Sequence, residues 1–382
     1  MLGSKLKTLA KRTAWTIAVS ALTLLAVRAF DSHRGPPLEV WHTFVPDELT
    51  AGEIERIDWK DYLDAENAAF EQVRTQVTER LDAEDRVAAN RYFADSPVYP
   101  GRFAQDWNRS FVLEPEGAPA GAVVLLHGLT DSPYSMRQVA RRYRERGFVA
   151  VVPRLPGHGT VPAGLSEVDW EDWAATTRLA VREATRRAGA GRPLHVVGYS
   201  NGGALAMKYA LDAVEDPSLP RPARVVLISP MIGVTEMARF AGLAGLPAVF
   251  PPFAKAAWLG IVPEFNPFKY NSFPVNGARQ SSLVTRALQP RIARLAAEGR
   301  LGELGRVLTF QSVTDFTVST AAVVNALYAH LPATGSELVL YDLNRHTKFG
   351  PLLRAGTQAL VDRLLPAGPR NYRTTVLSNA GT

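Results

Sequence analysis

The sequence predicts an α/β fold with a mostly parallel sheet covered by helices on both faces. Short runs rich in valine, leucine and isoleucine recur along the second part of the chain, and helix-like spans lie between them. Strands that are apolar throughout are typical of parallel sheets buried on both faces, and such sheets need helical crossovers. Catalytic groups are therefore expected in loops at the carboxyl ends of the strands.

The chain opens with a segment that is typical of a secretory signal or a membrane signal anchor. Four lysine and arginine residues between positions 5 and 12 precede an uncharged apolar run over 13–27. The run is shorter than the roughly 20 residues of a comfortable transmembrane helix, and Val27 and Ala29 resemble the small residues before a cleavage site. Residues 1–30 are therefore predicted to direct export, either as a cleaved signal or as a retained anchor.

A retained anchor would make the membrane a partner through this apolar segment. The positive-inside rule then keeps the basic N-terminal residues in the cytoplasm. The chain after residue 30 lies on the extracytoplasmic side, which is the periplasm in a bacterium. The formal net charge is +6, but five positive charges precede residue 31, where no acidic residue occurs. The rest of the chain is nearly balanced, so no nucleic-acid partner is expected.

Cysteine is absent, which excludes disulfides, thiolate metal sites and a cysteine nucleophile. The seven histidines are scattered, and none has the HExxH spacing of a zinc site. No metal and no organic cofactor is expected.

Residues 31–110 are expected to form a linker and an N-terminal helical segment. The stretch 31–46 is polar and contains prolines, whereas 47–90 is charged and has apolar residues three and four positions apart. That spacing predicts one or two helices packed on a larger body. No chemistry is evident in this part of the chain.

The core of the fold is expected in two stretches, 111–230 and 306–368, followed by a C-terminal tail over 369–382. The runs at 109–115 and 121–128 flank a turn-rich stretch and predict a hairpin. The further predicted strands are 148–155, 194–200, 223–230, 306–312 and 336–342. The predicted helices are 133–147, 170–188, 201–214, 319–330 and 351–365.

Residues 231–305 interrupt this alternation and are too long for a single crossover. The stretch is rich in aromatic residues and proline. It is predicted to be an inserted helical cap that covers the strand ends and lines an apolar substrate pocket. A helical insertion that packs around a small core of its own is compatible with the same pattern.

Ser200 is the candidate nucleophile. It lies between Gly198 and Gly202, directly after the apolar run 194–199 and before a helix-like stretch. A strand, a strained turn and a helix are the context of a nucleophile elbow, in which glycines permit close approach of strand and helix. A glycine-rich turn with Ser200 as a helix cap is the alternative, and it holds only if the catalytic partners are missing.

A histidine base and a carboxylate are expected in loops after later strands. His346 follows the last predicted strand by four residues and precedes the last predicted helix. Asp315 follows the preceding strand, 306–312, and gives the order Ser…Asp…His that this architecture uses. Asp342 is the competing acid because it is close to His346 in sequence. Asp315 is favoured because a neighbouring strand end brings a carboxylate to the imidazole more readily.

An oxyanion hole needs two backbone N–H groups. One is expected from Asn201, the residue after the nucleophile. The other is expected from Leu129, in the loop after the strand that ends in His127 and Gly128. A plain β–α turn is the alternative for that loop.

Five motifs occur in order: LLHGLTDSP, VVPRLPGHGT, GYSNGG, SVTDFTV and NRHT. Together they resemble the α/β-hydrolase superfamily, and within it the branch of carboxylesterases and monoacylglycerol-lipase-like serine hydrolases. The resemblance covers about residues 111–368. It implies an α/β-hydrolase fold with Ser200 as nucleophile, Asp315 as acid and His346 as base. The amides of Leu129 and Asn201 are then the oxyanion donors, and no cofactor is needed.

The expected function is that of a serine hydrolase that cleaves small or lipid-like carboxylic esters with apolar acyl groups through an acyl-enzyme. An acyltransferase, a thioesterase or a peptidase would use the same triad. A catalytically inactive, membrane-anchored binding protein on this fold is an alternative of a different class, since a fold alone does not establish function.

Overall fold

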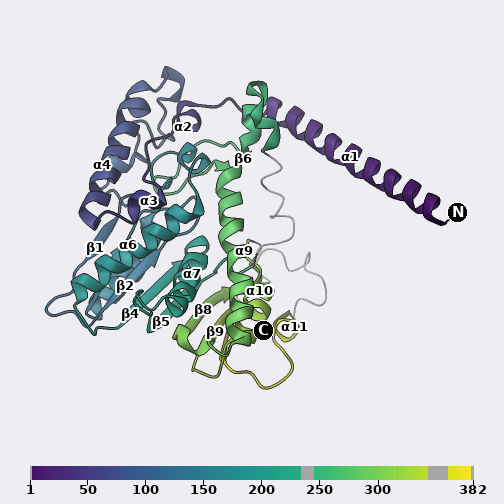
Figure 1. The fold of residues 1–382 in the computed structure, drawn as a ribbon. Coiled ribbons are helices and arrows are strands. Elements are labelled where there is room, and N and C mark those ends of the chain that lie inside the picture. Colours follow the sequence, from purple (N-terminus) through teal and green to yellow (C-terminus); the bar gives the residue numbers. More distant parts are fainter. Residues whose placement is uncertain (1, 234–244, 316, 343–359, 380–382) are drawn as a thin grey trace.

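The computed structural model describes residues 2–233, 245–315, 317–342 and 360–379 (Figure 1). Its centre is an eight-stranded sheet of order β1-β3-β2-β4-β5-β8-β9-β10, in which β1 is antiparallel to β3 and the other pairs are parallel. The strands are β1 (Phe111–Leu113), β2 (Gly121–Leu126), β3 (Phe148–Val152), β4 (Leu194–Tyr199), β5 (Arg224–Ile228), β8 (Arg306–Ser312), β9 (Glu337–Asp342) and β10 (Arg373–Ser378). The predicted α/β fold with a mostly parallel sheet is confirmed.

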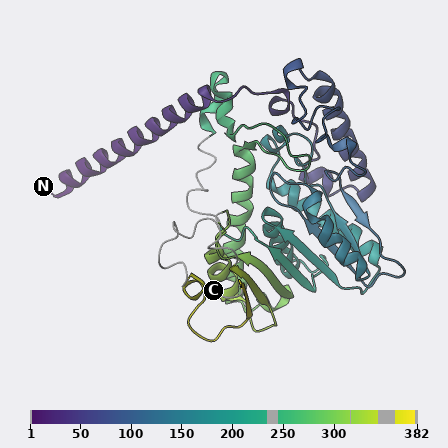
Figure 2. The same cartoon turned by 180° about the vertical axis from the view of Figure 1, so that it is seen from behind.

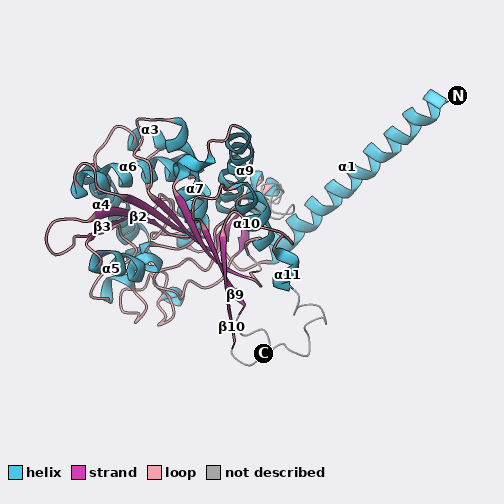
Figure 3. Ribbon diagram, turned by 90° about the horizontal axis from the view of Figure 1, so that it is seen from below, coloured by secondary structure: helices cyan, strands magenta, loops and turns pink. Residues whose placement is uncertain are grey.

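Helices cover both faces of this sheet, as Figure 3 shows. One face carries α5 (Arg137–Glu145), and the other carries α6 (Trp170–Ala188), α7 (Asn201–Glu215) and α9 (Val275–Ala297). Shorter elements of the core are η4 (Pro133–Met136), η5 (Pro162–Ser166), α10 (Thr320–Ala326), η10 (Tyr328–His330) and α11 (Leu360–Leu364). Most of the helix predicted over 351–365 lies outside the described residues.

The strands at the centre are apolar on both faces because each face meets a different helical layer. On β2, Val124 and Leu126 belong to the larger apolar cluster, together with side chains of α6 and α7. Val123 and Leu125 alternate with them and belong to a second cluster that includes Ala140 of α5. All four β2 side chains are fully buried. This two-sided burial is the physical reason for the unbroken apolar runs in the sequence.

Two strand pairings differ from the expectation. The predicted hairpin is wrong: β1 pairs with β3, and both edges of β2 are occupied by the parallel strands β3 and β4. The three-residue β1 therefore takes the free edge of β3. Within the stretch expected as a tail, Arg373–Ser378 forms β10 and pairs with β9 over its whole length.

The N-terminal helix α1 (Leu2–Arg34) extends away from the body in two opposite views (Figures 1 and 2). Its span Leu9–Asp31 has a mean hydropathy of 1.5, and none of it is buried against the body, so it is long and apolar enough to cross a membrane. The chain contacts the body at the C-terminal end of α1 and directly after it. Arg28 donates to the carbonyl of Trp258, and Lys255 Nζ donates to the carbonyl of Gly35 over 2.7 Å.

The segment after α1 is built into the body. It contains α2 (Val40–Thr43), α3 (Ala51–Ile54), α4 (Trp59–Gln76), η1 (Thr78–Arg80), η2 (Ala83–Asp85) and η3 (Pro100–Arg102). Arg154, which follows β3, donates to Glu48 over 2.7 and 2.9 Å and to Glu66 of α4 over 3.2 Å. The Arg154 and Glu66 side chains are almost fully buried. Breaking a buried pair costs about 3–5 kcal/mol, so this cluster fixes the segment on the core.

The insertion over 231–305 has two parts. The first contains η7 (Leu246–Val249), η8 (Pro251–Ala257), β6 (Trp258–Gly260) and β7 (Phe273–Pro274), and the second contains α9 and η9 (Leu301–Leu304). Along α9, Val284, Leu288 and Ile292 belong to the main core, so this helix completes a helical layer of the sheet. In the first part Phe250 and Phe265 are exposed. The covering of the strand ends by this insertion stays a prediction.

Candidate active site at the carboxyl ends of the strands

Ser200 occupies the turn between β4 and α7, as the sequence predicts. Its φ of 53° and ψ of −116° lie in the positive-φ region, which non-glycine residues seldom adopt. Backbone hydrogen bonds hold this conformation. The Ser200 N–H donates to the carbonyl of Ile228 over 2.9 Å, and its carbonyl accepts from Gly203 over 2.9 Å and from Met231 over 3.0 Å. A strained residue held in this way between strand and helix is a common feature of functional turns.

The two glycines that flank Ser200 are required by contacts of the backbone. A Cβ at Gly198 would lie 2.1 Å from the carbonyl oxygen of Gly202, and a Cβ at Gly202 would lie 2.2 Å from the carbonyl oxygen of Leu126. Both distances are far inside van der Waals contact, so any side chain at either position would force the strand and the helix apart. The spacing of the GYSNG motif therefore has a steric cause.

The loop after β2 lies beside the nucleophile turn. A Cβ at Gly128 would lie 3.3 Å from the Cβ of Ser200, which places the following residue, Leu129, close to the serine. Asn201 opens α7, and the first amides of a helix have no partner within it. Within the described ranges, neither the Leu129 nor the Asn201 amide donates to a protein oxygen. Their role as oxyanion donors stays a prediction.

The side chain of Asn201 links this turn to α9, a contact that the sequence does not reveal. Its Oδ1 accepts a hydrogen bond of 2.7 Å from Ser281 Oγ, and the asparagine is fully buried. Ser281 is also buried, and it lies on α9 one turn before Val284. The insertion therefore contacts the residue directly after the candidate nucleophile.

His127 shapes the loop after β2. Its Nε2 accepts from the amide of Leu155 over 3.1 Å, so its Nδ1 carries the proton and donates to the carbonyl of Gly128 over 2.9 Å. Full burial lowers the pKa of His127 to about 4, which keeps the imidazole neutral. Both nitrogens are thus engaged, and the ring of His158 packs 4.9 Å away. His127 is therefore not available as a base.

Asp315 lies after β8, at the same end of the sheet as Ser200 with β5 between the two strands. Its Oδ1 accepts from the amides of Thr317 and Val318 over 2.9 and 3.0 Å, and its Oδ2 accepts from Gln311 Nε2 over 3.3 Å. Burial raises the pKa of Tyr199, the neighbour of Ser200, and the carboxylates of Asp131 and Asp315 raise it further.

His346 lies outside the described residues. The competing acid, Asp342, ends β9, which is the next strand after β8 in the sheet. The triad thus stays a prediction, with its nucleophile and both candidate acids placed at strand ends. In the described part of the chain no group of three or more histidine, aspartate and glutamate side chains could hold a metal ion.

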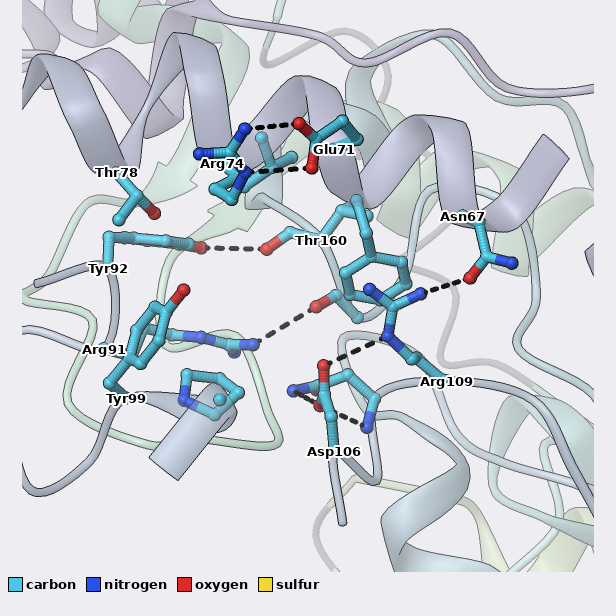
Figure 4. Close-up of a pocket in the computed structure, with 16 residues that line it drawn as sticks. Asn67, Glu71, Arg74, Thr78, Arg91, Tyr92, Tyr99, Asp106, Arg109 and Thr160 are labelled. Carbon is cyan, nitrogen blue, oxygen red and sulfur yellow. Dashed lines mark hydrogen bonds and ion pairs between the residues drawn. The ribbon is translucent and has the colours of Figure 1, made fainter. Parts of the chain in front are cut away.

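A separate cavity of about 580 Å³ lies between α4 and the loops over 91–109 (Figure 4). None of the candidate catalytic residues lines it. It belongs to the N-terminal segment, in which the sequence indicates no chemistry.

Comparison with known proteins identifies relatives of this chain. A family model described as "Alpha/beta hydrolase family" matches residues 123–381, which is more than half of the chain. A thermostable monoacylglycerol lipase from Bacillus sp. (strain H-257) is 35% identical over 95 residues, which are 25% of this chain and 36% of the lipase. The magnesium-chelatase 30 kDa subunit of Rhodobacter capsulatus is 32% identical over 160 residues, which are 39% of this chain and 45% of the subunit.

The chain thus spans less than half the length of these two relatives. Among solved structures, one from a study of LipS and LipT, two metagenome-derived lipolytic enzymes, superimposes with a TM-score of 0.48 at 23% identity. The superposition covers 67% of this chain and 95% of that structure.

Proposed function

Since this chain belongs to the alpha/beta hydrolase family, we propose that it is a serine hydrolase that cleaves carboxylic esters through an acyl-enzyme. Ser200 is the nucleophile, His346 the general base and Asp315 the carboxylate that orients the imidazole. The observation that carries this proposal is the turn at Ser200. A serine with a φ of 53° between two glycines whose side chains would strike backbone atoms is a turn built to present one hydroxyl.

The proposed reaction has two halves. In the first, Ser200 Oγ attacks the ester carbonyl while His346 takes the hydroxyl proton, and the oxyanion is bound by the amides of Leu129 and Asn201. His346 then gives this proton to the leaving alcohol as the acyl-enzyme forms. In the second half, His346 takes a proton from water, the hydroxide attacks the acyl carbon, and the carboxylic acid leaves as the proton returns to Ser200. Each half conserves atoms and protons and requires no cofactor.

The proposed substrates are esters with apolar acyl groups. The relative named a monoacylglycerol lipase supports a lipid-like ester. The aromatic, proline-rich insertion supports it as well, because its helix α9 contacts Asn201 through Ser281 and so reaches the oxyanion site. The insertion is proposed to form the cap over the acyl group.

An inactive binding protein on the same fold is the second candidate. The relative named a magnesium-chelatase subunit carries a name that does not describe hydrolysis, so family membership leaves this class open. Acyltransferase, thioesterase and peptidase activities share the proposed triad and are distinguished by their substrates.

Labelling with a fluorophosphonate separates the enzyme from the binding protein. We expect the purified full-length protein to be labelled, and we expect labelling to disappear in Ser200→Ala and to fall strongly in His346→Ala. A panel of esters with acyl chains of increasing length then tests the substrate class, with matched amides and thioesters beside them. A wild-type protein that is neither labelled nor active on any of these would contradict the proposal.

We further propose that α1 holds the protein in a membrane with its body on the side opposite the basic N-terminal start. The span Leu9–Asp31 is apolar and unburied, and the positive charges precede it. Alkaline extraction of membranes tests this location, and the mass of the mature protein distinguishes a retained α1 from a cleaved signal. Recovery of the full-length chain in the alkaline supernatant would contradict the anchor.

A further inference from the structure

A cavity of about 560 Å³ lies at the amino ends of the strands, at the end of the sheet opposite Ser200. Ser200 follows the carboxyl end of β4, which pairs in parallel with β5, and the five residues of β5 span about 16 Å. The cavity is therefore roughly one strand length from the catalytic turn. Its charged lining residues are the first residues of β5, β8, β9 and β10 and one residue of the loop before β10: Arg224, Arg306, Glu337, Arg373 and Arg370.

The strand register places four of these side chains on one face of the sheet. Arg224 is directly opposite Arg306, and Arg373 is directly opposite Glu337. Glu337 is also opposite Leu308, which lies two residues after Arg306 and so points to the same face. The two pairs are therefore neighbours in one row across β5, β8, β9 and β10.

This face of the sheet is open at the arginines. It is the face that carries α5, because Leu308 packs against the apolar cluster that includes Ala140 of α5. The helix α5 contacts β1, β2 and β3, and it lies at the other end of the sheet from β9 and β10 (Figure 3). All four arginines are exposed, so their guanidinium groups can be reached from solvent.

The charges along this row are unbalanced. Glu337 is the one carboxylate among the lining residues, and it accepts a hydrogen bond from Thr375 Oγ1 over 2.7 Å. None of the four arginines forms an ion pair in the part of the chain that the structure describes. Four guanidinium groups and one carboxylate thus leave three positive charges uncompensated.

The facing pair of Arg224 and Arg306 is unfavourable without an anion. Neighbouring strands are about 4.8 Å apart, and like charges directly opposite each other are destabilising. The side chain of Arg306 lies beside the turn before β9, since a Cβ added at Gly335 would be 3.6 Å from Arg306 Nε. An anion between the guanidinium groups of the row would remove the repulsion.

The row of cations is longer than a single phosphate. Three strand intervals separate β5 from β10, which is about 14 Å. Guanidinium groups bind phosphate oxygens in a bidentate manner, and a chain of phosphoryl groups distributes its charges along such a row. The volume of the cavity lies within the range of roughly 300–1,000 Å³ that is usual for small-molecule ligands.

We propose that this cavity binds a small soluble molecule with a chain of two or more phosphoryl groups. Arg224 and Arg306 hold one phosphoryl group, and Arg370 and Arg373 hold the next. The site is separate from Ser200, and the proposal does not rest on hydrolase activity.

Calorimetric titration of the full-length protein in a non-ionic detergent with pyrophosphate tests this proposal. We expect saturable binding that is at least about tenfold tighter than that of orthophosphate, because the second phosphoryl group reaches the second pair of arginines. Citrate has a similar charge and should bind less tightly than pyrophosphate, because a carboxylate offers fewer oxygens to guanidinium groups than a phosphoryl group does. Absence of saturable binding, or equal affinity for pyrophosphate and for either orthophosphate or citrate, would overturn the assignment.

Variants of the row give the matched comparison. Arg224→Gln and Arg306→Gln should each weaken pyrophosphate binding by about fivefold, which corresponds to about 1 kcal/mol for an exposed charge pair. Glu337→Gln should strengthen binding by a similar factor, because it removes the negative charge of the lining and keeps an oxygen for Thr375. Arg102→Gln, which alters an exposed arginine of η3 outside this lining, should leave binding unchanged. Unchanged binding in both Arg224→Gln and Arg306→Gln, or equal weakening in Arg102→Gln, would place pyrophosphate elsewhere.

Two further measurements separate this site from folding and from catalysis. Without ligand, Arg224→Gln should not lower the melting temperature, because it removes a charge that faces Arg306. Ser200→Ala, and the wild-type protein labelled with a fluorophosphonate, should bind pyrophosphate with unchanged affinity, so either proposal can fail alone. Loss of binding in Ser200→Ala would place pyrophosphate at the catalytic turn and overturn the assignment.

Discussion

The turn after β4 and the turn after β8 each present one candidate catalytic side chain, but they are held in different ways. At Ser200 the backbone is fixed by contacts closer than any side chain allows, as the 2.1 and 2.2 Å distances at Gly198 and Gly202 show. At Asp315 the turn is held by hydrogen bonds that its own carboxylate accepts. The first turn thus restricts residue types by steric exclusion, and the second only requires a group that accepts hydrogen bonds.

The largest effect is expected at the nucleophile turn itself. Ser200→Ala should lower kcat/KM for a p-nitrophenyl ester by about 10⁴-fold or more, because the attacking oxygen is removed. The melting temperature should stay unchanged, since the Ser200 side chain makes no capping hydrogen bond to α7. Ser229→Ala is the matched control: Ser229 follows β5 and also has a positive φ, of 43°. Comparable losses in the two variants would show that the turn geometry alone does not identify the nucleophile.

The acid turn should give the next largest effect. Asp315→Asn is expected to lower kcat/KM by about 10³-fold, because a neutral amide neither orients the imidazole in the required tautomer nor stabilises its charged form. Asp342→Asn should change kcat/KM by less than about tenfold under the same assay. If instead Asp342→Asn gives the large loss and Asp315→Asn the small one, Asp342 at the end of β9 is the catalytic acid.

Steric exclusion at the nucleophile turn can be measured as stability. Gly202→Ala should lower the free energy of unfolding by about 3 kcal/mol, because the added methyl group must displace the Leu126 carbonyl. Gly52→Ala is the matched control in α3, where an added methyl group would meet no other atom within 4 Å. This variant should change stability by less than about 1 kcal/mol and in the stabilising direction. Denaturation monitored by circular dichroism compares the two variants, and similar stabilities would refute the steric explanation of the motif.

The smallest effect is expected from a positioning residue of the acid turn. Gln311→Met removes the hydrogen bond to Asp315 Oδ2 and should lower kcat about three- to tenfold with KM unchanged, since one neutral donor contributes about 1 kcal/mol. Gln280→Met removes another buried glutamine, which lies on α9 of the insertion and donates to Asp169, the residue directly before α6, over 2.7 Å. It should alter stability but not kcat. A loss confined to stability in Gln311→Met would mean that Gln311 does not orient the acid.

The same contrast explains how much the sequence could predict. The β4 turn, its two glycines and the helix after it follow from a local pattern with a steric cause. The pairing of β1 with β3, by contrast, depends on which strand edges remain free after the sheet has formed. β10 reaches β9 from about thirty residues further along the chain. Neither is encoded in the short segments themselves.

Two further features depend on contacts that no local pattern contains. Arg154 lies within the predicted strand 148–155, whereas in the structure it follows the end of β3, and its partners Glu48 and Glu66 come from a segment without recognisable chemistry. The sequence predicts a role only for the amide of Asn201, whereas its side chain binds Ser281 of the insertion.

The attachment of α1 has a consequence for how the protein meets its substrate. Residues 35–39 join α1 to α2, a stretch of at most about 18 Å when fully extended. Arg28 of α1 also donates to the carbonyl of Trp258 in β6, and Lys255 of η8 donates to the carbonyl of Gly35, directly after α1. If α1 spans a bilayer as proposed, the body is held at a fixed height and in one orientation above it. The rate on a membrane-resident ester would then depend on the number of molecules per unit area of membrane and not on the concentration in the surrounding volume.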